Sequence, residues 1–133
     1  MPRPLRALSL ALLVALLQLG PGCGRGGSSS SAPAVSASAR LEAQSLFAAR
    51  CAGCHGLQGR GDGPNGQKLS PRPRDFSDAE WQRSVGDEQL RGIIVRGGRV
   101  SGKSGFMPAF PDLEGKRELL DAVVRTVRGF ESK

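Results

Sequence analysis

The chain of 133 residues is poor in large and in metal-binding side chains. It has one histidine, one tryptophan and no tyrosine, and its other aromatic residues are five phenylalanines. A domain of about 90–95 residues can fold alone, but it buries only a modest share of its surface. With so few large side chains, such a domain would gain stability from an apolar cofactor. The single histidine also excludes a site that needs two.

The sequence has no concentrated run of positive charge. Its 19 Lys and Arg against 12 Asp and Glu give a net charge of +7. Three of the arginines precede residue 40, so residues 40–133 carry 16 basic and 12 acidic residues, a balance of about +4. The basic residues are scattered and few aromatics lie between them, which argues against nucleic-acid binding. A modest positive field favours an acidic protein partner, and an ordinary mixed-charge surface is the alternative.

The amino-terminus has the pattern of an export signal. Arg3 and Arg6 precede a 13-residue apolar run, residues 7–19, as in a secretory signal peptide. The run is shorter than the roughly 20 residues that a membrane-spanning helix needs. We therefore predict a signal peptide over residues 1–22 and export to an oxidising compartment, the periplasmic side of a bacterial membrane. An uncleaved short anchor is the alternative.

Cys23 lies four residues after the apolar run and follows a glycine. This arrangement resembles a bacterial lipoprotein signal, in which the cysteine is lipidated and becomes the new amino-terminus. On this interpretation residues 23–39 form a lipid-anchored flexible linker rich in Gly, Ser and Ala, and residues 40–133 form the folded domain. The alternative is ordinary cleavage after a small-x-small site, at residues 32–34 or 37–39, which would leave a soluble periplasmic protein.

Helical patterns lie at both ends of the folded part. Residues 40–54 have an apolar face at i, i+4 and i+8, and either Ser36 or Ser38 can cap its start. Residues 115–130 carry the clearest apolar stripe, formed by Leu119, Leu120, Val123, Val124 and Val127. No alternating strand pattern is present. The predicted fold class is therefore small and all-α.

The middle of the folded part predicts two shorter helices between loops. Ser77 with Glu80 three residues later is typical of a capping box, so we expect a short helix to begin there. Residues 86–98 have acidic side chains in their first turn and Gly97 as a stop signal. The flanking stretches, residues 56–73 and 98–114, are rich in Gly or Pro and are expected to be loops.

The motif Cys51-Ala52-Gly53-Cys54-His55 brings two thiols and the one imidazole within five residues. A structural disulfide would leave the histidine unused. A thioredoxin-like redox pair would need strands, and a zinc site needs four ligands, whereas the remaining Cys23 lies beyond the linker. Covalent haem attachment uses every group, since two sulfurs about one turn apart match the two vinyl groups of a haem and the imidazole faces its iron.

The number of cysteines supports haem attachment. In an exported protein, a disulfide between two of three cysteines would leave one thiol unpaired. Two thioether bonds at Cys51 and Cys54 and one lipid at Cys23 leave none. We therefore predict one covalently bound haem c, with His55 as one ligand of its iron.

Met107 is the predicted sixth ligand. It is the one methionine that remains after the signal is removed, and it lies in the stretch Ser-Gly-Phe-Met-Pro-Ala-Phe. A neutral thioether suits low-spin iron, and the following proline holds Met107 in an extended conformation. A Met107 that only fills the core, and an open iron site, are the alternatives.

With these motifs, residues 40–133 resemble a class I monohaem cytochrome c of the small bacterial Met/His type. Phe47 stands where the first helix of that family carries an aromatic residue against the haem, and the sequence around Met107 resembles its ligand loop. The resemblance implies three to five helices around one haem, with the first and last helices crossing. It also implies that a proline carbonyl, for which Pro64 is the candidate, accepts the hydrogen bond of the ligand histidine. Val123 departs from the family, where an aromatic residue is common.

The function implied is one-electron transfer between redox proteins outside the cytoplasmic membrane, with no small-molecule substrate and no enzymatic activity. Arg72, Arg74 and the indole N–H of Trp81 are candidates for the haem propionates, and plain surface exposure is the alternative. The protein could instead be the electron-entry subunit of a respiratory or dehydrogenase complex. A haem-based gas sensor would require a labile Met107.

Overall fold

The computed structural model describes residues 34–132. Within these residues every regular element is helical and no strand occurs, so the predicted all-α fold is confirmed. No described helix is both long and apolar enough to cross a membrane. The predicted signal peptide and the lipidation candidate Cys23 lie outside the described residues.

Seven helical elements follow one another along the described chain. Three of them form one nearly continuous rod at its start, and the remaining four are separated by loops. In order they are α1 (Ala37–Leu46), the π-helical turn η1 (Phe47–Cys51), α2 (Ala52–His55), α3 (Ala79–Ser84), α4 (Asp87–Val100), the 3-10 turn η2 (Pro111–Leu113) and α5 (Arg117–Arg128).

The first helix starts at Ala37, three residues before the predicted start and inside the stretch that we expected to belong to the linker. Ser36 caps it, because its hydroxyl oxygen accepts a hydrogen bond from the N–H of Ala39 at 3.2 Å. Val35 and Ala39 are buried in the core. The Ser- and Ala-rich composition indicates a linker, but alanine is also the best helix former once a cap and a packing surface are present.

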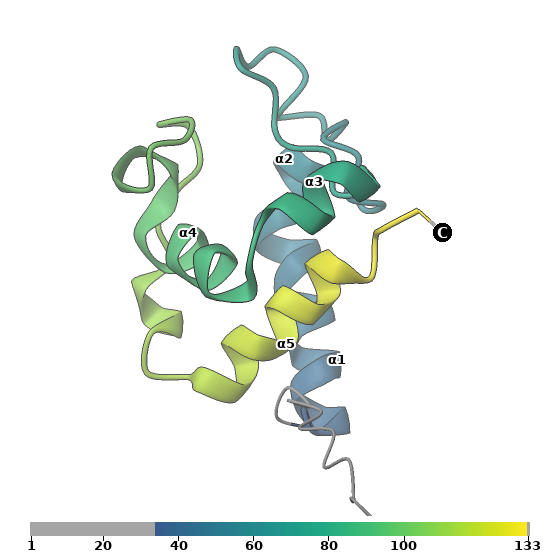
Figure 1. Ribbon diagram of the computed structural model, residues 1–133, viewed down its shortest axis with the longest axis vertical. Coiled ribbons are helices and arrows are strands. Elements are labelled where there is room, and N and C mark those ends of the chain that lie inside the picture. Colours follow the sequence, from purple (N-terminus) through teal and green to yellow (C-terminus); the bar gives the residue numbers. More distant parts are fainter. Residues whose placement is uncertain (1–33, 133) are drawn as a thin grey trace, which may run out of the picture. The chain divides into compact units, whose positions relative to one another are not determined.

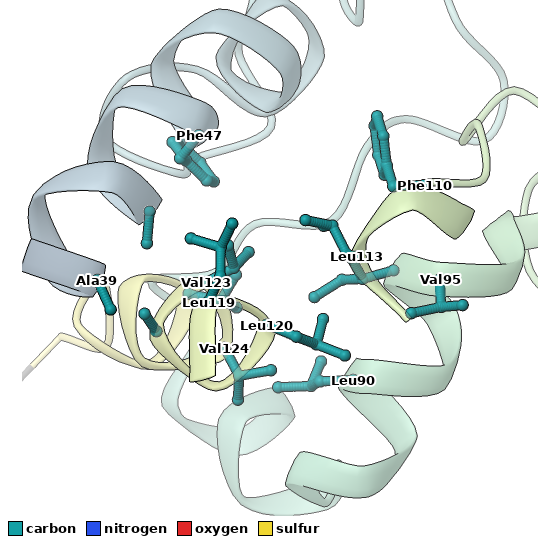
Figure 2. Packing of buried hydrophobic residues seen from close by; sticks show 14 of the residues in the cluster. Ala39, Phe47, Leu90, Val95, Phe110, Leu113, Leu119, Leu120, Val123 and Val124 are labelled. Atoms are coloured by element: carbon teal, nitrogen blue, oxygen red, sulfur yellow. The ribbon is translucent and has the colours of Figure 1, made fainter. Parts of the chain in front are cut away.

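The first and last helices pack together and cross, as predicted (Figure 1). The apolar stripe of α5 is buried, and in Figure 2 it lies between Ala39 and Phe47 on one side and Leu90 and Val95 of α4 on the other. Val123, which stands where an aromatic residue is common in the resembling family, is 2% exposed. The helix crossing is therefore closely packed with the smaller side chain.

The cap of α3 lies one residue later than predicted. Asp78, not Ser77, accepts the backbone hydrogen bonds of the first turn, from Glu80 at 3.0 Å and Trp81 at 3.1 Å. Ser77 is engaged instead with Asp75, because its N–H and its hydroxyl both donate to Asp75 Oδ1. A carboxylate at the next position is an equally good cap, which is why the two starts could not be told apart in the sequence.

Helix α4 is interrupted at Gly97, where φ is +79°. The predicted stop is thus correct for the regular helix, but one further turn follows and reaches Val100. The predicted loop after it contains that turn and η2.

A buried polar cluster joins α3 to α5. The amide of Gln82, which is 4% exposed, donates to the carbonyl oxygens of Phe76 at 2.7 Å and Val127 at 2.9 Å. Arg128 of α5 donates to the Gln82 carbonyl at 2.6 Å and to that of Val85 at 2.5 Å. Because buried polar groups are stable only when they are paired, this cluster holds residues 76–85 against α5.

Candidate haem site

The helices and loops surround a cavity of about 1100 Å³, slightly larger than the usual range for small-molecule and cofactor sites, about 300–1,000 Å³. Its walls come from the first helical rod, the loop before α3, α4, the loop after α4, and α5. The buried apolar side chains among them are Phe47, Phe76, Val85, Leu90, Ile94, Phe110, Leu113, Val123 and Val127. The hollow is therefore suited to a large, mainly apolar group.

Cys51, Cys54 and His55 all line this cavity and are all half-buried. The π-helical turn ends at Cys51, and the single turn of α2 then presents Cys54 and His55. The two cysteines are free thiols. Burial raises the pKa of Cys51 to about 11, and the neighbouring Arg50 only partly opposes this. Cys51 is thus a protonated thiol at neutral pH, unlike the low-pKa nucleophile of a thioredoxin-like pair.

His55 is prepared to bind a metal through one nitrogen. Its Nδ1 lies 3.2 Å from the carbonyl oxygen of Arg74, to which it donates. Burial lowers the pKa of His55, and the Arg74 hydrogen bond opposes this only in part. The ring is therefore neutral at neutral pH, with Nε2 free to act as a ligand.

The acceptor of this hydrogen bond corrects the prediction for Pro64. Pro64 is exposed and does not line the cavity. The backbone around it is tied to the attachment motif instead, because Gly63 N–H donates to the Cys54 carbonyl at 3.1 Å and Asn65 N–H donates to the Gly53 carbonyl at 2.8 Å. Residues 63–65 thus hold the backbone of the motif, whereas Arg74 and Phe76 of the following segment contact the imidazole itself.

Phe76 was not predicted as a site residue. Its ring is stacked on His55, with centroids 4.4 Å apart and planes 16° from parallel, and on Trp81, with centroids 5.4 Å apart. It therefore limits the rotation of the imidazole. An isolated phenylalanine in a loop carries no sequence signal for such a contact, because the contact depends on the cluster that holds this segment against α5.

Met107 lines the same cavity as His55 and is half-buried. Its carbonyl oxygen accepts a hydrogen bond from Gly98 N–H at 3.1 Å. A side chain at Gly97 could not be accommodated, since its Cβ would lie 2.9 Å from the backbone nitrogen of Ala109. The glycine pair that ends the regular part of α4 thus also lets the loop of residues 101–110, here called the methionine loop, approach the helix closely.

The three candidates for propionate contacts, Arg72, Arg74 and Trp81, all line the cavity. Both arginines are exposed and Trp81 is half-buried, and the Arg74 guanidinium lies 5.7 Å from the centre of the indole ring. Whether they bind propionates stays a prediction. Three further cations line the cavity and were not predicted, namely Arg50, Arg60 and Lys103.

These features fit a covalently attached haem. Two thiols and one neutral imidazole lie on a single short segment, and a thioether from a distant loop lines the same apolar hollow. In the part of the chain that the structure describes, no group of three or more His, Cys, Asp and Glu side chains could hold a bare metal ion. Two cysteine thiols and an adjacent histidine are the residues that attach a c-type haem and bind its iron.

Comparisons with known proteins agree with this assignment. The model of the family described as cytochrome C oxidase, cbb3-type, subunit III matches residues 38–125. The solved structure of the KustC0563 c-type cytochrome is 30% identical to this chain, with a TM-score of 0.52, and the similarity covers 68% of this chain and 98% of that one. A comparison with curated protein sequences found no match.

Proposed function

Because this chain belongs to the c-type cytochromes, in the family of cytochrome c oxidase cbb3-type subunit III, we propose that it is an electron carrier with His55 and Met107 as axial ligands. Membership of this family implies covalently bound haem c and haem-based electron transfer. The proposal adds the class I ligand pair, the redox-protein partners and the location outside the cytoplasmic membrane.

One observation carries the proposal: His55 and Met107, 52 positions apart in the sequence, line the same cavity as the two free thiols. Bound haem c supplies an iron that changes between the +2 and +3 states by one electron. An imidazole nitrogen and a thioether sulfur would fill both axial positions of that iron. No substrate could then reach the metal without displacing a ligand, which leaves electron transfer as the chemistry.

The surrounding residues favour the reduced state. Thioether ligation raises the potential of a haem relative to a second nitrogen ligand. The apolar wall acts in the same direction, because Phe47, Leu113 and Val123 are each at most 4% exposed and keep water from the site. The Arg74 carbonyl and the Phe76 ring hold the imidazole in one orientation. Little rearrangement would accompany a change of valence.

The proposed location rests on the sequence. Lipidation at Cys23 would tether the protein to the periplasmic side of a bacterial membrane and raise its effective concentration near membrane-bound donors and acceptors. If Cys23→Ser left the mature protein equally membrane-bound, the anchor would lie elsewhere. Ordinary cleavage would release a soluble periplasmic carrier with the same haem site.

A second candidate is favoured by the family description, which names a subunit of an oxidase. In that case the chain would be the electron-entry haem subunit of a larger respiratory complex. It would then copurify with a catalytic partner at fixed stoichiometry, whereas a free carrier would not.

The test of the proposal is the visible spectrum of the oxidised holoprotein. We expect the weak charge-transfer band from sulfur to ferric iron in the wild type and its loss in Met107→Ala, while the haem stays covalently attached. Ala109→Ser, an exposed position in the same loop that does not line the cavity, is the matched control and should keep the band. A band that survives in Met107→Ala would refute the ligand assignment. Ready binding of carbon monoxide by the reduced wild type would favour a gas sensor.

A further inference from the structure

Arg50, directly before the attachment motif, makes a two-point contact across the cavity wall. Its Nη1 and Nη2 donate to the two carboxylate oxygens of Asp112 at 2.8 Å and 2.9 Å. Asp112 lies in η2, the short turn that follows the methionine loop. Two parallel charge-assisted hydrogen bonds fix orientation as well as distance, which a single contact cannot do.

The same guanidinium also contacts the end of the methionine loop. Its central carbon lies 4.4 Å from the centroid of the Phe110 ring, in the position of a cation–π contact. Phe110 is buried, and its N–H donates to the carbonyls of Ile94 at 3.1 Å and Val95 at 3.2 Å. The residue against which Arg50 stacks is therefore itself firmly held on α4.

This contact joins two segments that are otherwise anchored separately. The backbone of the methionine loop is hydrogen-bonded to α4 at Lys103 and Met107, which both bond Gly98, and at Phe110, and η2 packs on α4 and α5. In the part of the chain that the structure describes, the Arg50–Asp112 pair is the hydrogen-bonded side-chain link between residues 47–55 and residues 101–113.

We propose that Arg50 is a positioning residue: its contact with Asp112 and Phe110 keeps the methionine loop closed against the haem-attachment segment and so keeps Met107 on the iron. This inference rests on the proposed ligation by Met107. It assigns to Arg50 control over how readily the sixth ligand is replaced, while the ligand itself and the haem attachment do not depend on Arg50.

The size of the effect follows from the exposure of the pair. The Arg50 and Asp112 side chains are 37% and 46% exposed, so solvent screens their attraction. The stacking on Phe110 adds to a modest bidentate pair. An external ligand binds only when the loop is open, so its apparent affinity scales with the open fraction. Loss of the contact should raise that fraction, and with it the affinity, about five- to tenfold.

The experiment measures the apparent Kd of imidazole for the ferric holoprotein, followed by loss of the sulfur-to-iron band. Arg50→Ala and Asp112→Asn should each lower this Kd about five- to tenfold. The double variant should show no larger change than either single one, because both remove the same interaction. Arg50→Lys should resemble Arg50→Ala, since lysine keeps the charge but not the two-point contact or the stacking.

Arg40→Ala is the matched control. Arg40 lies on the same helical rod, makes two hydrogen bonds to the Val35 carbonyl and does not line the cavity. It should leave the imidazole Kd at the wild-type value. Equal Kd values in the wild type, Arg50→Ala and Asp112→Asn would overturn the inference, and so would a wild-type Kd in Arg50→Lys, which would indicate a charge effect. If the wild type lacks the band, it is the Met107 ligation that fails.

Discussion

His55 and Met107 line the same cavity, but the chain holds them by different means. His55 is the last residue of the helical rod that packs on α5, its carbonyl oxygen accepts a hydrogen bond from Gly61 N–H, and the Phe76 ring is stacked on its imidazole. Met107 lies in a loop whose backbone is hydrogen-bonded to α4 at Lys103, at Met107 and at Phe110. Beside it the Phe106 side chain is 62% exposed.

The two ligand segments differ in how closely their displacement is coupled to unfolding of the main core. Displacing His55 would require breaking contacts that also belong to the main core, whereas the methionine loop could open while α1 and α5 stay packed. Local opening with a small free-energy cost is typical of segments with few buried contacts. We therefore expect substitutions around His55, the histidine side, to lower the free energy of unfolding of the whole domain. Substitutions in or against the methionine loop, the methionine side, should change only the proposed ligation by Met107.

The largest effect should come from Gly63→Ala on the histidine side. The new Cβ would lie 2.5 Å from the carbonyl oxygens of Ala52 and Gly53, which are backbone atoms that cannot move aside. We expect the free energy of unfolding to fall by roughly 3 kcal/mol, and the yield of covalently loaded protein to fall with it. Urea denaturation and the mass of the product measure both. Gly86→Ala, where nothing lies within 4 Å, is the control, and equal stability of the two variants would contradict the proposed support.

An intermediate effect is expected for Gln82→Ala. The substitution removes the side-chain donor to the carbonyls of Phe76 and Val127, and it also removes the Gln82 Oε1 that accepts from Arg128. This should lower the free energy of unfolding by about 2 kcal/mol, yet leave the sulfur-to-iron band unchanged. Gln44→Ala, at an exposed position on α1, should change neither quantity. Loss of the band in Gln82→Ala would show that the two sides of the cavity are not independent.

The smallest effect on stability should come from Gly98→Ala on the methionine side. The added Cβ would overlap the carbonyl oxygen of Ser104 and would lie 3.1 Å from Met107 Cβ. Because Ser104 belongs to the methionine loop, which can open without unfolding the core, we expect loss of the band and a lower midpoint potential with haem still attached, and a stability change below about 1 kcal/mol. Gly105→Ala, whose Cβ would meet only the end of Arg99 at 3.4 Å, is the control. A variant that unfolds instead would refute the local opening.

Local signals in the sequence were sufficient to find the helices at both ends of the domain and the attachment motif, but they did not predict the π-helical turn η1 or the 3-10 turn η2. The apolar stripe of α5 and the helical turn that carries Cys51, Cys54 and His55 follow from spacing within a few residues. Predictions that depended on one precise position were less accurate. The start of α1 and the cap of α3 each shifted, because several neighbouring residues could serve as the cap and only packing selects among them.

The covalent site for haem was determined by residue type and spacing, because two thiols and one imidazole within five positions form one local unit whatever surrounds them. Long-range folding alone decided three contacts of the site. These are the Arg74 carbonyl that accepts the imidazole hydrogen bond, the Phe76 ring stacked on the imidazole, and the Arg50 guanidinium paired with Asp112 after the methionine loop. These partners are separated by 19, 21 and 62 positions in the chain. Such contacts form because helices α4 and α5 bring distant loops to one cavity, and no pattern within a short window encodes that arrangement.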